Sequence, residues 1–238
     1  MQRITRLSAS LALALGIALE SGAGELKPFQ VTYSVDWHGF TAGVSTLTLA
    51  SNGPGLWTYR SSSEARGLFR AVLGGEITQR SDMRLTVDGI QPLHYVGDDG
   101  KASTERDIDL EFDWQRLRVS GTAGGRPVDA PIKPGTQDDL SVQIALIHEL
   151  DNGRTPTSFQ TYGDGGAREY KYLRDGAETL QTPLGVIATV IFRTERSGSP
   201  RVTRYWCAPS LGYLPLRAQQ KRNDDVEWTM DVRTLKRE

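Results

Sequence analysis

The stretch Phe29-Gln-Val-Thr-Tyr-Ser-Val-Asp-Trp37 alternates apolar and polar residues with a period of two. Successive side chains of a β-strand point to opposite faces of a sheet, so the five apolar side chains of this stretch share one face. The next run, from Val44 to Ala50, repeats the pattern with Leu47 and Leu49 on one face. The alternation predicts half-buried strands rather than helices.

Similar runs continue to the end of the chain and are separated by Gly, Pro, Asn and Asp, which favour turns. Regular strands at this spacing predict a mostly β fold in which sequential strands are neighbours. We expect a single antiparallel, strongly curved sheet or incomplete barrel, of the lipocalin-like or lipoprotein-carrier-like type. Asp98-Asp99-Gly100 is a hairpin signal, since Asp-Gly readily adopts the positive φ angles of a type I′ turn.

One segment, residues 138–150, has the periodicity of a helix instead. Leu140, Ile144 and Ile147 fall on one stripe. Thr136 or Asp138 can cap the N-terminus of this helix, and Gly153 can end it. We expect the stripe to plug or cover the sheet, with Gln143 and His148 on the exposed side.

The N-terminus has the order of a secretory signal peptide: Arg3 and Arg6, then an apolar run from Leu7 to Leu19, then Ser21-Gly-Ala23. The apolar run is too short to span a bilayer, which takes about 20 helical residues. We expect residues 1–23 to be a signal peptide, rather than a buried helix, and residues 24–238 to form a single β domain. No cysteine lies near the cleavage point, so the mature protein should be periplasmic or otherwise exported, soluble, without a transmembrane segment and without a lipid anchor.

The overall charge excludes one class of partner. The formal net charge of the 238 residues is −1, whereas a nucleic-acid-binding protein normally has a basic excess. Cys207 is the only cysteine, so no intramolecular disulfide can form. Its apolar, strand-like surroundings indicate a buried structural thiol, because a catalytic thiol needs a nearby base.

No motif names a reaction, a cofactor or a metal. The three histidines lack ligand spacing, and His148-Glu149 has no second histidine four residues after the first. Acidic residues alternate from Asp107 to Asp113, about 6.6 Å apart along a strand, which is too far for all of them to bind one calcium ion. They are expected to form a solvated face that pairs with arginines of neighbouring strands. The arginines considered are Arg80, Arg84 and Arg118.

Aromatic residues in the predicted strands suggest a binding role. Their ordinary place is the core, but a concave sheet can also keep an apolar cavity open for a hydrophobic ligand. The segment Glu64–Leu73 could form a short helix or a flap over such an opening. The candidate ligand-binding residues are Trp37, Trp57, Tyr59, Tyr95, Tyr205 and Trp206.

The chain resembles a bacterial family of exported proteins known as domain-of-unknown-function 3108. The resemblance implies an exported, mostly β domain and supplies no catalytic residue. It covers nearly the whole mature chain and rests on an ordered set of short motifs. These are Tyr33-Ser-Val-Asp-Trp-His-Gly39 with Ala42-Gly43, Ala65-Arg-Gly-Leu68, Asp138-Asp-Leu-Ser141, Thr182-Pro-Leu-Gly185, and Arg204-Tyr-Trp206 with Leu214-Pro215.

Three functions are compatible with these patterns. The first is a non-catalytic binding module for a lipid or other apolar molecule of the cell envelope, by analogy of fold. The second is a hydrolase acting on envelope polysaccharide, which would need two convergent carboxylates in a cleft. The third is a scaffold that pairs with a protein partner through an exposed strand edge. The patterns favour binding over catalysis and leave the protein partner unknown.

Overall fold

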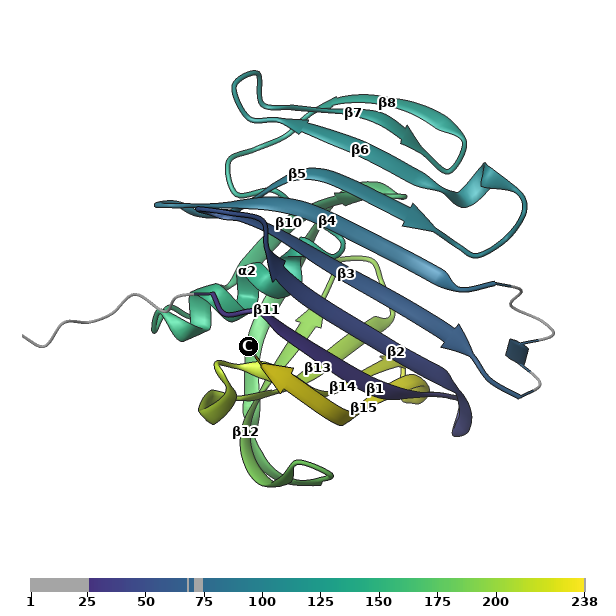
Figure 1. Ribbon diagram of the computed structural model, residues 1–238, viewed down its shortest axis with the longest axis vertical. Helices are drawn as coiled ribbons and strands as arrows, with labels where there is room; N and C mark the ends of the chain where they lie inside the picture. Colours follow the sequence, from purple (N-terminus) through teal and green to yellow (C-terminus); the bar gives the residue numbers. More distant parts are fainter. Residues whose placement is uncertain (1–25, 68, 71–74, 238) are drawn as a thin grey trace, which may run out of the picture.

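The computed structural model describes residues 26–67, 69–70 and 75–237. Within these residues fifteen strands form one sheet, in the order β8-β7-β6-β5-β4-β3-β2-β1-β15-β14-β13-β12-β11-β10-β9 (Figure 1). Sequential strands are neighbours, as predicted. Two pairings depart from a simple antiparallel order: β1 joins β15 in the middle of the sheet, and β9 pairs with β10 in parallel.

The elements follow the predicted alternation closely, with short connections. The strands are β1 (Phe29–Trp37), β2 (Phe40–Ser51), β3 (Leu56–Ala65), β4 (Ile77–Thr86), β5 (Gly89–Asp98), β6 (Ile108–Asp113), β7 (Arg118–Ala123), β8 (Arg126–Pro131), β9 (Gln137–Asp138), β10 (Ser158–Gly163), β11 (Gly166–Thr182), β12 (Gly185–Glu195), β13 (Arg201–Ala208), β14 (Leu214–Arg222) and β15 (Asp225–Arg237). The helices are η1 (Thr104–Arg106), α2 (Ser141–Asp151) and η2 (Pro209–Leu211).

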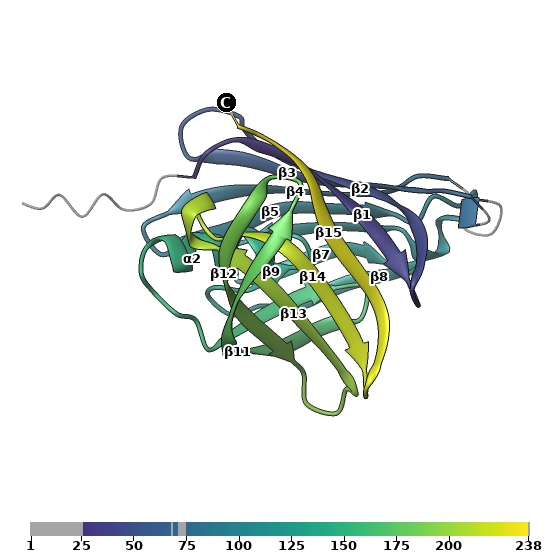
Figure 2. The ribbon, with the colours of Figure 1, turned by 90° about the horizontal axis from the view of Figure 1, so that it is seen from below.

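The sheet curls on itself without closing. Its two ends, β8 and β9, are not paired with each other. Instead β9 meets β4 and β5: the Ser81 hydroxyl donates to Asp138 Oδ2 at 2.5 Å, and Gln137 Nε2 donates to the Ile90 carbonyl at 2.8 Å. Strands β6, β7 and β8 continue past this contact (Figure 1), and Figure 2 shows the strands wrapping around an interior. The predicted incomplete barrel is confirmed.

The interior is built by the alternation that predicted the strands. Phe29, Val31 and Tyr33 are buried, and so are Leu47 and Leu49 on the neighbouring strand. The pattern weakens toward the end of β1, where Trp37 is 44% exposed. The pairing of β1 with β2 shifts register between Val35 and Asp36, because a bulge interrupts the ladder there.

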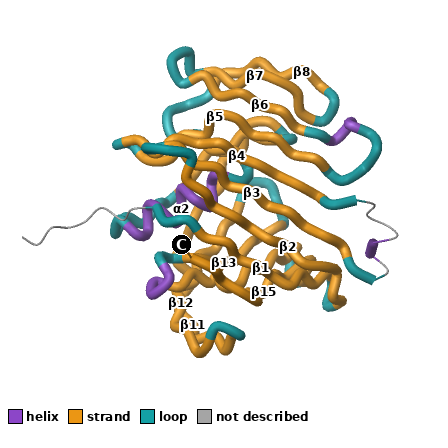
Figure 3. The backbone as a smooth tube through the Cα atoms, viewed as in Figure 1, coloured by secondary structure: helices purple, strands orange, loops and turns teal. Residues whose placement is uncertain are grey.

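Helix α2, purple among the strands in Figure 3, packs against the curled sheet, and most of its side chains are buried. Its N-cap position is Leu140, which forms no side-chain cap, rather than Asp138 or Thr136. Asp138 instead holds the turn before the helix, because its Oδ1 accepts the backbone N–H groups of Leu140 and Ser141 at 2.8 and 2.6 Å. The helix starts later than expected, since Gln137 and Asp138 pair with β10 as a strand. Gly153 follows the helix with φ +71°, the left-handed conformation that ends many helices.

Two expectations about exposure and turns were wrong. His148 is buried rather than exposed, and burial lowers the pKa of its imidazole. Asp98-Asp99-Gly100 does not close a two-residue hairpin, because β6 begins only at Ile108 and η1 occupies part of the connection. Gly100 does adopt a positive φ of 74°, and its N–H binds Asp98 Oδ1 at 2.7 Å.

Candidate functional site

An apolar cavity of about 520 Å³ opens where β1, β2 and β3 end beside β15. Its volume is within the range of small-molecule sites. Hydrophobic side chains dominate its lining, and Glu64 is its charged side chain. The principal lining residues are Val35, Trp37, Phe69, Ile77, Trp228 and Met230.

Strand register brings these residues to one face. Val35 lies opposite Met230, and Trp37 lies opposite Trp228. Directly opposed residues of antiparallel strands project to the same side of a sheet, so the four form a contiguous wall. On the other neighbour of β1, Val35 lies opposite Gly43, which has no side chain to fill the space. A Cβ at Gly43 would lie 2.1 Å from the Glu64 carbonyl oxygen, so only glycine fits this close approach of β2 to β3.

We call this space the apolar cavity. Large apolar side chains remain exposed around it. Trp37 packs edge-on against His38, with ring centroids 5.2 Å apart. Phe40, opposite Trp37 across the β1–β2 hairpin, is 70% exposed, and Ile77 is 37% exposed. Contiguous exposed apolar surface of this kind is typical of interaction sites.

The segment predicted as a short helix or flap is described only in part. Glu64 and Ala65 complete β3, and Phe69 contributes to the wall of the apolar cavity. Leu68 and residues 71–74 lie outside the described residues. Phe69 thus links this segment to the apolar cavity.

The six aromatic residues proposed from the sequence occupy different places. Trp37 lines the apolar cavity, whereas Trp57, Tyr59 and Tyr95 are buried in the main core. The Tyr59 hydroxyl donates to Gln143 Oε1 at 3.2 Å. Gln143 was expected on the exposed side of the helix, but its side chain is hydrogen-bonded to the core. The Tyr95 hydroxyl accepts Gln79 Nε2 at 2.9 Å. Burial raises the pKa of both phenols, which keeps them neutral.

The remaining two aromatic residues lie on β13. Trp206 is buried and donates from Nε1 to Glu178 Oε2 at 2.7 Å, with the Arg217 guanidinium 5.7 Å from its ring. Tyr205 is half-buried and packs near Cys207. Cys207 is fully buried, as predicted, and burial raises the pKa of its thiol to about 12. A thiol with such a pKa is protonated and unreactive at neutral pH.

Trp228, Met230 and Val35 were not selected from the sequence as ligand contacts. Trp228 did lie in a predicted strand, but its position opposite Trp37 depends on the pairing of β1 with β15. No local signal encodes that pairing.

The expected acidic face on β6 is present, but its ion pairs differ from those predicted. Asp109 and Glu111 are exposed, and Asp109 contacts His94 Nε2 at 2.8 Å. Strand β7 lies between β6 and β8, and its Arg118 binds Asp129 on β8 rather than an acidic residue of β6. Arg80 pairs with Asp82 on its own strand.

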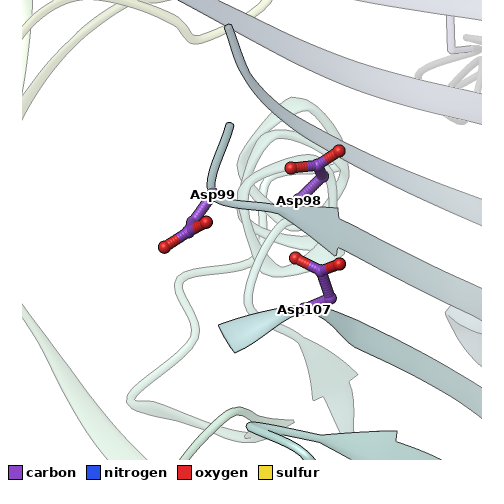
Figure 4. Close-up of side chains that lie close together, drawn as sticks. All are labelled: Asp98, Asp99 and Asp107. Atoms are coloured by element: carbon purple, nitrogen blue, oxygen red, sulfur yellow. The ribbon is translucent and has the colours of Figure 1, made fainter. Parts of the chain in front are cut away.

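Asp98, Asp99 and Asp107 form a cluster at the ends of β5 and β6, with one carboxylate oxygen from each within 4.8 Å of the others. Figure 4 shows Asp98 above Asp107 and Asp99 to their left. Asp98 binds the Gly100 N–H, and Asp99 binds the Lys101 N–H at 3.1 Å. These contacts stabilise the turn and account for two of the three carboxylates.

Two adjacent carboxylates, Asp138 and Asp139, bear on the hydrolase alternative. Burial raises the pKa of both, that of Asp138 to about 6. Asp138 is fully buried and accepts three hydrogen bonds, from Ser81, Leu140 and Ser141. Its carboxylate therefore ties β4 to the start of α2 and is buried rather than exposed in a cleft.

The strand-pairing alternative depends on free sheet edges. The edge strand β8 carries Pro127 and Pro131, which cannot donate backbone hydrogen bonds to an added strand. At the opposite edge, β9 has two residues and both are buried. Natural sheets limit edge-to-edge association with prolines and short, covered edges of this kind.

Comparison with known proteins agrees with this architecture. The profile of the family described as "Protein of unknown function (DUF3108)" matches residues 32–231. The chain belongs to the DUF3108 family. The sequence matches none of the curated proteins with which it was compared.

The DUF3108 chain also resembles a solved structure. It is similar to a β-barrel-like protein of the domain of unknown function DUF1849 from Brucella abortus, with a TM-score of 0.58 and 9% sequence identity. The alignment covers 90% of this chain and 99% of that one. At this identity the likeness establishes the fold alone. No helix among the described residues is long and apolar enough to cross a membrane.

Proposed function

We propose that this DUF3108 protein is an exported, non-catalytic binding protein of the cell envelope that holds a lipid chain or another apolar molecule in the apolar cavity. The observation that carries the proposal is the wall formed by Val35, Trp37, Trp228 and Met230. A folded domain ordinarily buries such side chains against one another, because exposed apolar surface costs about 25 cal/mol per Å². Here they line an open space instead.

Helix α2 belongs to the core rather than to the apolar cavity. Ile144 and Ile147 pack into the core, and neither lines the apolar cavity. The helix fills one part of the curled sheet, and the open space lies where β1, β2, β3 and β15 continue past it.

We expect Trp37→Ala to weaken binding of an environment-sensitive apolar dye about tenfold, because the indole supplies a large, half-exposed part of the cavity wall. The fold should persist, since Trp37 is not a core residue. Fluorescence titration gives the dissociation constants, and far-UV circular dichroism checks the fold.

The matched control is Val186→Ala, which removes an exposed apolar side chain from β12, outside the apolar cavity. Its dye affinity should equal that of the wild type. Absence of dye binding by the wild-type protein, or equal losses in both variants, would remove the support for an apolar-ligand site.

Export is the second part of the proposal. Residues 1–25 lie outside the described residues, so the signal peptide rests on the sequence order of Arg3 and Arg6, the apolar run and Ala23. We expect protein recovered from the periplasm to begin near Gly24 on N-terminal sequencing. Full-length protein found in the cytoplasm alone would contradict export.

A further inference from the structure

A second cavity, of about 260 Å³, lies on β11, β12, β13 and β14 and has three arginines in its wall. Arg168 comes from β11, Arg196 follows β12, and Arg201 begins β13. Thr203 and Gln220 contribute hydrogen-bonding groups beside them. We call this space the basic cavity.

Strand register places the basic cavity and the apolar cavity on the same face of the sheet. Thr194 lies opposite Thr203, Thr203 opposite Gln220, Gln220 opposite Trp228, and Trp228 opposite Trp37. Opposed residues project to one side, so these five form a row across five adjacent strands. The first three line the basic cavity, and the last two line the apolar cavity. Figure 2 shows β13, β14 and β15 side by side.

Neighbouring side chains of that row line the two cavities. Gln220 lines the basic cavity and Trp228 the apolar cavity, and their Cβ atoms should lie about 5 Å apart as an opposed pair. Counted from Trp228 on β15, Arg201 on β13 is two strands away, Arg196 after β12 three and Arg168 on β11 four, at about 4.8 Å per strand. A ligand that reaches both cavities must therefore extend along this row.

The charges of the basic cavity are only partly compensated. Arg201 is held by Glu227, with Nε to Oε2 at 2.7 Å, and this hydrogen bond lowers the pKa of Glu227. Arg168 approaches Asp164 at 3.4 Å. Arg196 is half-buried and forms no ion pair with any part of the chain that the structure describes. Arg196 thus leaves a positive charge available to an anion.

Resting on the proposed function, we infer that the ligand is an anionic amphiphile whose carboxylate or phosphate group binds Arg196 and Arg168 while its apolar chain occupies the apolar cavity. Guanidinium groups suit both anions, because their planar N–H donors match two oxygens at once. The polar side chains Thr203 and Gln220 fit the junction between charged group and chain.

The test compares ligands with one chain and different head groups: dodecanoate, dodecyl phosphate and dodecanol, titrated by quenching of tryptophan fluorescence. Wild-type protein should bind at least one of the two anions about tenfold more tightly than the alcohol. Tighter binding of dodecanoate would indicate a ligand with a carboxylate head group, and tighter binding of dodecyl phosphate a ligand with a phosphate head group. The difference should shrink at high salt, since part of it comes from partly exposed charges.

Arg196→Gln should abolish the preference for the anion and leave dodecanol affinity unchanged, and Arg196→Lys should restore part of it. The matched control Arg233→Gln removes an exposed arginine of β15 outside the basic cavity and should have no effect. Equal wild-type affinity for anions and alcohol would overturn the inference while leaving the apolar site intact. Failure to bind any of the three ligands would overturn both proposals.

Discussion

Ile144→Ala should lower the free energy of unfolding by about 4 kcal/mol, near the upper part of the range for truncating a buried aliphatic side chain. Ile144 is 0% exposed and belongs to the main core. The cost depends on how far the surroundings can collapse into the space left behind. Here collapse is restricted, because α2 is held from the other side by the contacts of Val142, Leu146 and Leu150 with a second apolar cluster.

Urea unfolding of the two proteins measures this loss. The matched control is Asp151→Ala at the exposed end of the same helix, which should change stability by less than about 0.5 kcal/mol. Gln143→Ala is unsuitable as a control, because Gln143 accepts the Tyr59 hydrogen bond. A loss below about 1 kcal/mol for Ile144→Ala would show that α2 is not the packed centre of the curled sheet.

The sequence predicts the elements of this fold well, and for a local reason. Alternation in residues 29–37 and 44–50 reports which side chains face the interior, and those side chains are buried. The helix was also located, but only one of its stripes was recognised. Val142 and Leu146 lie outside that stripe and pack, with Leu150, in a second apolar cluster, which is typical of a helix enclosed on all sides. The burial of His148 follows from that enclosure.

The candidate site is less accessible to sequence reasoning, because it is assembled by non-local pairing. Trp37 could be proposed as an aromatic residue in a strand. Its partner Trp228 lies near the other end of the chain and reaches it through the pairing of β1 with β15. The arginines of the basic cavity are likewise separated along the chain, and only the register of β11 to β14 brings them together. Local periodicity indicates to which face of the sheet each side chain points, but it does not indicate which residues of other strands lie beside it.

Asp138→Ala should lower the free energy of unfolding by about 3 kcal/mol at pH 5. The substitution removes the acceptor of the Ser81 hydroxyl and of the Leu140 and Ser141 N–H groups. A buried donor left without a partner costs about 1–3 kcal/mol, and Asp138 itself is 0% exposed. Asp88→Ala, in the exposed β4–β5 turn, is the control and should cost less than about 0.5 kcal/mol. Equal losses in the two variants would argue against a structural link through Asp138.

The isosteric variant Asp138→Asn cannot ionise, so the pH dependence of its stability, compared with that of the wild type, should show how ionisation of Asp138 affects the free energy of unfolding. Burial raises the pKa of Asp138 from 3.8 to about 6 in the folded protein. Between these values the folded state binds a proton that the unfolded state has released, so the contribution of Asp138 to stability is present below pH 4 and is lost as pH rises through about 6. A difference of two units corresponds to about 3 kcal/mol. Urea unfolding at pH 4 and pH 7 should therefore show the asparagine variant gaining about that much relative to the wild type. A constant difference between the two proteins across this range would mean that Asp138 ionises in the folded protein as it does in the unfolded chain.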